Sequence, residues 1–213
     1  MASDSTQRGE GRVEGNAVTS MRIAEVIEAS TTEFVAQCYD LDEVPDFGSF
    51  VRVRDRALDI YAVVSEVRTA SIDPGRRPMA RGQDVHDEDE LYRDNPEIRE
   101  LLRTELTATI VGFRHGDVVN HYLPPRPPRI HGFVHKCTDD EVQTFTARLD
   151  FLQTLLASPA RVALDELLAA AIRNAWQARG GEREFLVKAG KEVAQLLAND
   201  VNRLNGVLRR IGR

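Results

Sequence analysis

The sequence of 213 residues has few cysteines, few aromatic residues and no long hydrophobic run. Two cysteines, Cys38 and Cys137, are too few for a disulfide framework, so we expect a reducing, cytoplasmic location. No apolar run approaches the ~20 residues that a membrane helix needs. The N-terminal segment carries Glu10 and Glu14 and has no apolar core of a secretory signal, so we expect residues 1–19 to be a disordered leader.

The common catalytic signatures are absent as well. The sequence contains no G-x-S-x-G, H-E-x-x-H or G-x-G-x-x-G motif. It also lacks the G-x-x-x-x-G-K-[S/T] loop that binds nucleotide phosphates, and the nearest fragment, KAGKE at 188–192, misses the first glycine and the Ser or Thr. We therefore expect no catalytic residue, no cofactor and no nucleotide hydrolysis by this chain.

The composition is that of a soluble globular protein. Apolar residues make up 42% and charged residues 29% of a chain long enough for one large domain or two small ones. The formal net charge of −6 argues against a protein that coats nucleic acid through bulk electrostatics. Aromatic residues make up only 6%, which counts against a surface on which bases stack.

Residues 21–136 are rich in β-strand signals. Alternating or β-branched segments begin at Met21, Phe50 and Leu58, and Pro45 and Gly48 mark the turn before the second of them. Short strands with turns at close spacing favour a small β-barrel over a parallel sheet.

An acidic insertion interrupts these strands. Residues 84–105 hold nine acidic residues against three arginines, and Asn95 and Pro96 predict the N-cap and first position of a short helix there. From Leu106 the pattern becomes that of a strand. We expect the helix to close one side of the barrel by covering an open edge. The run of acids is more typical of a solvated loop or interaction tail than of catalytic carboxylates.

The pattern becomes helical after the stiff connector PPRPPR at 124–129. A capping box of Thr138 and Glu141 predicts the first helix start. Three helices are predicted, beginning at Thr138, at Ser158-Pro159 and at about Glu184, and ending near Leu156, Gly180 and Arg210. The third would be roughly 40 Å long.

The fold class predicted from these patterns is α+β. A small, OB-like N-terminal β-barrel spans residues 20–137, with the acidic loop and short helix inserted at 84–105, and a three-helix segment follows at 138–213. The sequence leaves open whether the helices pack on their own barrel or on another chain.

The barrel segment resembles a known family. The opening strand with "STTEF", the turn Pro45-Asp46-Phe47-Gly48, the passage "NPEIRELLRTELTATIVGF" ending in Gly112, and the exit "LPPRPPRIHGFVHK" are similar to the HAS barrel. This small barrel is shared by HerA-type DNA-translocating ATPases and the N-terminal domains of ATP synthase catalytic subunits. The resemblance covers about residues 21–136.

The resemblance implies an assembly role without catalytic residues in the barrel. In HerA proteins an ATPase domain follows the barrel, whereas these 213 residues contain no ATP-binding loop. We therefore expect an accessory module, self-associating or bound to a separately encoded HerA-type ATPase or nuclease, that acts in DNA processing or repair.

Three sets of residues are candidate sites. His131, His135 and Cys137 are the cluster of metal-type ligands, and a strand would place them on one face, although zinc sites usually need a fourth ligand. Arg76, Arg77 and Arg81 suit phosphate or nucleic-acid contact, with a solvated loop as the simpler interpretation. A helical stripe predicts an interaction face, formed by Val193, Leu197, Val201, Leu204 and Leu208.

Two other functions stay open beside the assembly role. One is a barrel that binds single-stranded nucleic acid directly, in the manner of OB-folds. The other is a small metal-dependent hydrolase that uses the His131, His135 and Cys137 cluster.

Overall fold

A computed structural model describes residues 20–75, 77–84, 86–159 and 163–212, so the predicted leader at 1–19 lies outside the described residues. The strands are β1 (Arg22–Ala29), β2 (Glu33–Cys38), β3 (Phe50–Asp55), β4 (Leu58–Ser71), β5 (Leu102–His115), β6 (Val118–Asn120) and β7 (Phe133–Lys136). The helices are α1 (Glu88–Asp94), α2 (Glu97–Glu100), α3 (Asp139–Phe145), α4 (Phe151–Leu156), α5 (Leu164–Gln177), α6 (Arg183–Leu196) and α7 (Val201–Ile211).

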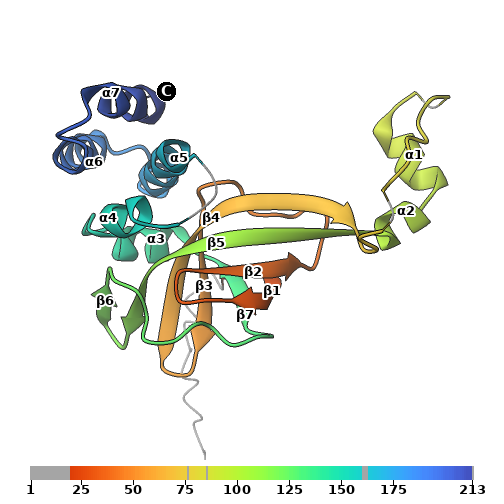
Figure 1. Ribbon diagram of the computed structural model, residues 1–213, viewed down its shortest axis with the longest axis horizontal. Helices are drawn as coiled ribbons and strands as arrows, with labels where there is room; N and C mark the ends of the chain where they lie inside the picture. The colour runs from red at the N-terminus through yellow and green to blue at the C-terminus, as the bar shows by residue number, and fades with distance from the viewer. Residues whose placement is uncertain (1–19, 76, 85, 160–162, 213) are drawn as a thin grey trace, which may run out of the picture.

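Six strands close into an antiparallel barrel, and helices follow it, which confirms the predicted α+β class (Figure 1). The strand order is β2-β1-β7-β3-β4-β5, and β5 pairs back with β2, while β6 extends the sheet from β5. Inward-facing apolar side chains fill the barrel, including Phe34, Val53, Ile60, Leu106 and Val134. Closure removes the open strand edges that would otherwise template aggregation.

Strands β4 and β5 form a long ribbon that leaves the barrel. They pair from Leu58 opposite His115 to Ser71 opposite Leu102, whereas β2 pairs with β5 only as far as Glu105. Figure 1 shows the far end of this ribbon projecting from the body and carrying α1 and α2 at its tip. We call residues 72–101 the arm.

The predicted helix at 95–105 is much shorter than expected and does not close the barrel. Helix α2 spans four residues and buries none of them, and β5 already begins at Leu102. Asn95 is not an N-cap: its side-chain amide donates to the carbonyl oxygen of Leu91 at 3.0 Å and ends α1. The barrel needs no cover there because β5 and β2 seal it by pairing.

The C-terminal helices lie on one outer wall of the barrel, formed by β3, β4 and β5 (Figure 1). Outward-facing side chains of these strands share one core with the helices, and they are Phe50, Tyr61, Val63 and Val111. Helices α3 and α4 lie nearest the wall, α5 follows, and α6 and α7 are outermost (Figure 1). The helical segment therefore packs on its own barrel, which answers the question that the sequence left open.

Two of the three predicted helices are interrupted. The capping box at Thr138 starts α3 as predicted, with both reciprocal hydrogen bonds present, but α3 ends at Phe145 and α4 starts at Phe151. The predicted 40 Å helix is divided into α6 and α7. Helix α7 begins after Asp200, because the Asp200 side chain accepts a hydrogen bond from the Arg203 backbone N–H as an N-cap does.

Helix α5 ends near the predicted glycines but begins later than expected. It starts at Leu164 rather than at Ser158-Pro159, and residues 160–162 between them are not described. Gly180 and Gly181 follow the helix with φ values of 64° and 83°, a conformation that glycine adopts without strain.

We predict that Gly48→Ala destabilises the protein by about 2–4 kcal/mol. Gly48 has a φ of 85°, and an added Cβ would lie 2.4 Å from Cβ of Ala170 in α5, so strain and clash combine. Gly116→Ala is the matched control, because Gly116 has a φ of 58° and no atom within 4 Å of the added Cβ. Urea unfolding should show a loss of only about 1–2 kcal/mol for the control. Equal losses would contradict the close approach of α5.

Candidate functional site

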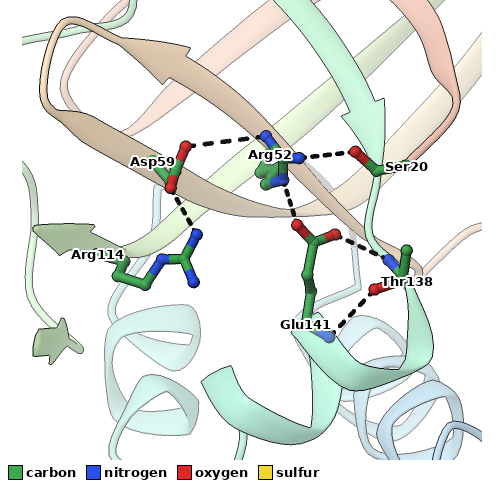
Figure 2. A network of polar contacts seen from close by, with 6 residues as sticks. All are labelled: Ser20, Arg52, Asp59, Arg114, Thr138 and Glu141. Carbon is green, nitrogen blue, oxygen red and sulfur yellow. Dashed lines mark hydrogen bonds and ion pairs between the residues drawn. The ribbon is translucent and has the colours of Figure 1, made fainter. Parts of the chain in front are cut away.

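A polar network joins the helices to the covered wall of the barrel (Figure 2). Arg52 of β3 lies at its centre: Nε donates to Glu141 Oε1 of α3 at 2.6 Å, and Nη2 donates to Ser20 Oγ at 2.6 Å. On the neighbouring strands, Arg114 Nη2 donates to Asp59 Oδ2 at 2.7 Å. Asp59 and Arg114 are directly opposite each other in the β4–β5 register, so strand pairing alone brings these charges together.

Glu141 has two roles in this network. One carboxylate oxygen accepts from Arg52, and the other accepts from the Thr138 backbone N–H at 2.9 Å to complete the capping box. The side chains of Arg52 and Glu141 are only 16% and 19% exposed. The start of α3 is therefore fixed to the barrel wall by a shielded ion pair.

The opposite wall, formed by β2, β1 and β7, carries an exposed aromatic patch. The Arg22 guanidinium carbon lies 4.5 Å from the ring centroid of Phe133 and 5.2 Å from that of Tyr39. These two rings are 47% and 52% exposed. We call this wall, with Arg22, Tyr39 and Phe133, the free wall. Stacked guanidinium and aromatic groups of this kind are frequent in protein interfaces.

Acidic and histidine side chains border the aromatic patch. Tyr39 donates its hydroxyl to Glu25 Oε2 at 3.2 Å, and His131 Nδ1 lies 2.5 Å from Glu25 Oε1. The hydrogen bond with His131 lowers the pKa of Glu25 below its ordinary value, so Glu25 stays ionised at neutral pH. The patch therefore presents one cation and one anion between two rings.

Sequence reasoning missed the free wall. Phe133 stands next to buried Val134, and Tyr39 next to buried Cys38, so strand alternation assigns both rings to the outside. That signal was readable, but it gives no indication that rings from two distant segments lie beside the same arginine, Arg22. The pairing of β1 with both β2 and β7 brings them together on either side of Arg22.

The three metal-ligand candidates do not share a face. His131 precedes β7, has a φ of 64° and points its ring at Glu25, while His135 lies within β7 and Cys137 follows it. Burial raises the pKa of the Cys137 thiol well above its ordinary value, which opposes the thiolate that zinc requires. Across the described residues, no group of three or more His, Cys, Asp and Glu side chains is placed to hold a metal ion.

His121 belongs to the core between the helices and the barrel. Its ring packs 4.8 Å from that of Phe145, and Nε2 lies 2.8 Å from the Phe145 carbonyl oxygen. A cleft of about 390 Å³ opens beside it, lined in part by Tyr122, Asp150 and Thr154. The Thr154 hydroxyl donates to the His121 carbonyl oxygen, so these polar groups mainly join α4 to the segment after β6.

Two of the candidate phosphate-binding arginines, Arg77 and Arg81, lie on the arm and not beside the aromatic patch. Arg77 is exposed, Arg81 donates to Glu97 at 3.2 Å, and Arg76 lies outside the described residues. The arm is acidic as a whole, with nine acidic residues against five arginines between positions 73 and 101. The structure thus separates these candidate arginines from the rings of the aromatic patch, which an OB-type nucleic-acid surface would combine with them.

The predicted helical interaction face is not one continuous face. Val193 and Leu197 are buried in the core of the same chain, and Leu204 packs against it. Val201 and Leu208 are exposed on α7, beyond the break at Asp200. Most residues of the predicted stripe therefore pack inside their own chain.

The barrel fold and a match to a known domain family together define the class of this domain. The chain forms a closed six-stranded antiparallel barrel that bears helices on one wall. Residues 23–116 match the family model of the HAS barrel domain. Residues 23–116 therefore form a HAS barrel domain, as the resemblance predicted. No curated protein matches the chain. Among the described helices, none is long and apolar enough to cross a membrane.

The matched segment ends before the barrel is complete. Strand β7 (Phe133–Lys136) lies outside residues 23–116, yet it pairs with both β1 and β3 and closes the barrel between them. The residues after the matched segment therefore complete the family fold in this chain.

Removing the attachment at Arg52 should destabilise the protein. We predict that Arg52→Met lowers the free energy of unfolding by about 1–3 kcal/mol, because Glu141 loses its shielded cation. Glu141→Gln keeps the capping box but removes the charge, so the double variant should cost less than the sum of the single losses. Arg148→Met, at an exposed pair with Asp150, is the control and should change little. Strict additivity would contradict the coupling.

Stability should also fall at acid pH because of His135. Burial, with the nearby Arg52 cation, lowers the pKa of His135 below its ordinary value, and its Nδ1 has no hydrogen-bond partner. The unfolded chain, with an ordinary pKa near 6.5, then binds the proton more readily. This contribution is complete above about pH 6.5 and declines below it.

Urea midpoints measured from about pH 8 to about pH 5 test this expectation. His135→Gln should reduce the decline, whereas His115→Gln, at an exposed position on β5, should leave it unchanged. An identical pH profile for wild type and His135→Gln would show that another group causes the decline.

Proposed function

We propose that this protein is a non-catalytic accessory module that docks through its barrel on a separately encoded HerA-type ATPase in DNA processing. The proposal extends the HAS barrel assignment, since barrels of this kind resemble the assembly collar of those ATPases. These 213 residues contain no ATP-binding loop, so the proposal assigns ATP hydrolysis to a separate protein.

The observation that carries the proposal is that helices cover one wall of the barrel and leave the other wall exposed. The wall of β3, β4 and β5 is covered by the chain's own helices, whereas the free wall exposes Arg22, Tyr39 and Phe133. Aromatic and arginine side chains are the residue types that dominate binding energy in protein interfaces. Their stacked arrangement is already formed, so little side-chain entropy is lost when a partner binds.

Charges near the free wall favour a protein partner over nucleic acid. Glu25 contacts the patch directly, and Glu28 and Glu33 follow on the same two strands. A nucleic-acid backbone would be repelled by these carboxylates. The rival function would instead use the arm arginines. It predicts a steeply salt-dependent DNA affinity that is lost on replacing Arg76, Arg77 and Arg81.

The expected result is that Tyr39→Ser/Phe133→Ser releases the ATPase. A tagged full-length protein is used to capture partners from native lysate at moderate salt, and mass spectrometry identifies them. Recovery of a HerA-type P-loop ATPase should fall roughly tenfold or more with the double variant, because each removed ring is a candidate hot spot. Capture of the ATPase at equal yield by both proteins would refute docking through the free wall.

Val118→Ser is the matched control for this experiment. Val118 is exposed on β6, away from the free wall, so the substitution removes apolar surface without touching the patch. Its capture yield should equal that of wild type. Unchanged thermal unfolding of the double variant would show that the lost binding is not lost folding, since both rings are half-exposed.

A further inference from the structure

We propose that the acidic arm of one copy binds the basic outer face of α6 and α7 on a second copy. The two elements lie at opposite ends of the longest axis of the molecule (Figure 1). An arm therefore cannot reach the helices of its own chain. A contact between unlike surfaces of this kind joins copies head to tail, as a ring or an open chain.

Charge complementarity identifies the occupant as a second copy. Between positions 73 and 101 the chain has nine acidic residues against five arginines. Between 183 and 211 it has six basic residues against three acidic ones, and two of the six, Arg203 and Arg210, pair with Asp165 and Glu166 of α5. Among the described residues, the basic side chains outside ion pairs on these helices are Arg183, Lys188, Lys191 and Arg209. The unpaired acids within the described part of the arm include Asp89, Asp94 and Glu100, all exposed. Arms would repel one another, so a symmetric arm-to-arm contact is disfavoured.

The basic face has a regular layout along α6. Arg183, Val187 and Lys191 are exposed and spaced four residues apart, so they form one stripe on the helix. Leu208 of α7 lies beside it, because its Cδ2 is 3.6 Å from the position of a Cβ on Gly190. In the described residues Arg183 and Lys191 have no ion-pair partner, unlike Arg203 and Arg210, which bind Asp165 and Glu166.

The arm has matching apolar residues between its acids. Ile72 donates its backbone N–H to the Leu101 carbonyl oxygen at 2.9 Å, so these two half-exposed side chains stand side by side at the base of the arm. Asp73 and Glu100 flank them in sequence. In the proposed contact, Ile72 and Leu101 of the arm pack on Val187 and Leu208 of the second copy. The acidic residues beside the first pair then face the basic residues beside the second pair. The opposite charges supply the salt-dependent part of the affinity and select the register, and burial of the apolar pairs adds to it.

The inference deepens the proposed assembly role but is tested without any ATPase. Sedimentation of the purified full chain should show association at about 0.1 M salt that is lost near 1 M, as the Debye length falls from about 10 Å to about 3 Å. The arm variant is Asp89→Lys/Asp94→Lys/Glu100→Lys, and the helix variant is Arg183→Glu/Lys191→Glu. Each alone should be monomeric, with the association constant reduced roughly tenfold or more.

The decisive step is to mix the two variants. A lysine-bearing arm then faces a glutamate-bearing helix, while the native arm faces the native helix, so association should return in the mixture. Glu66→Lys/Asp117→Lys changes charge at exposed sites elsewhere and should associate like wild type. A monomeric wild type at low salt, or a mixture that stays monomeric, would overturn the proposal. Either result would leave ATPase capture through the free wall unaffected.

Discussion

The stacking of Phe145 on Tyr61 is the contact on which the arrangement of this protein depends. The two ring centroids are 4.5 Å apart with the planes 16° from parallel, and Phe145 also packs against Phe50 and Phe151. Tyr61 points out of the barrel rather than into it, so without the helices this wall would expose large apolar side chains to water. Burying one such side chain contributes about 1.5–3 kcal/mol. The helices are therefore part of the barrel's own stability and not a separable appendage.

The position of the helices follows from the way the barrel closes. Strand β7 enters between β1 and β3, and its His135 stands opposite Arg52. Only Cys137 separates β7 from the Thr138 cap, and the Cys137 backbone N–H donates to the Phe50 carbonyl oxygen. The short connection from β7 therefore places the first turn of α3 next to β3. In that turn Glu141 binds Arg52 of β3, and one turn later Phe145 stacks on Tyr61 of β4.

Local signals in the sequence predicted much of this fold. Most of the features that the sequence failed to predict depend on contacts between residues far apart in the chain. The strands that begin near Met21, Phe50 and Leu58, the Thr138 capping box and the glycines after α5 depend on residues close in sequence, and they were correctly predicted. The helix lengths were not, because the apolar spacing from Val193 to Leu208 continues across the Asp200 cap that divides α6 from α7. Apolar periodicity shows which side chains face a core. Two separate helices that pack on the same core can have one uninterrupted apolar pattern, so the pattern does not show where one helix ends and the next begins.

The site was less predictable than the fold for the same reason. The metal candidates were chosen by side-chain chemistry and spacing along an assumed strand, but His131 lies in the turn before the strand begins. The patch on the free wall combines Arg22 of β1, Phe133 of β7 and Tyr39 directly after β2, and strand pairing places both rings beside Arg22. No sequence spacing encodes that meeting. It follows from β7, the strand that also closes the barrel and starts the helices.

Covering one barrel wall with helices leaves distinct surfaces for different contacts. The covered wall cannot dock another barrel while Phe50, Tyr61 and Val63 are buried under α3, α4 and α5. Contacts between barrels are therefore restricted to the free wall, and the arm and the outer face of α6 and α7 remain at the two ends of the molecule (Figure 1). Because these surfaces do not overlap, the proposed partner on the free wall and the proposed neighbouring copies at the two ends would not exclude one another. The stack of Phe145 on Tyr61 thus fixes the fold and also decides which surfaces remain for assembly.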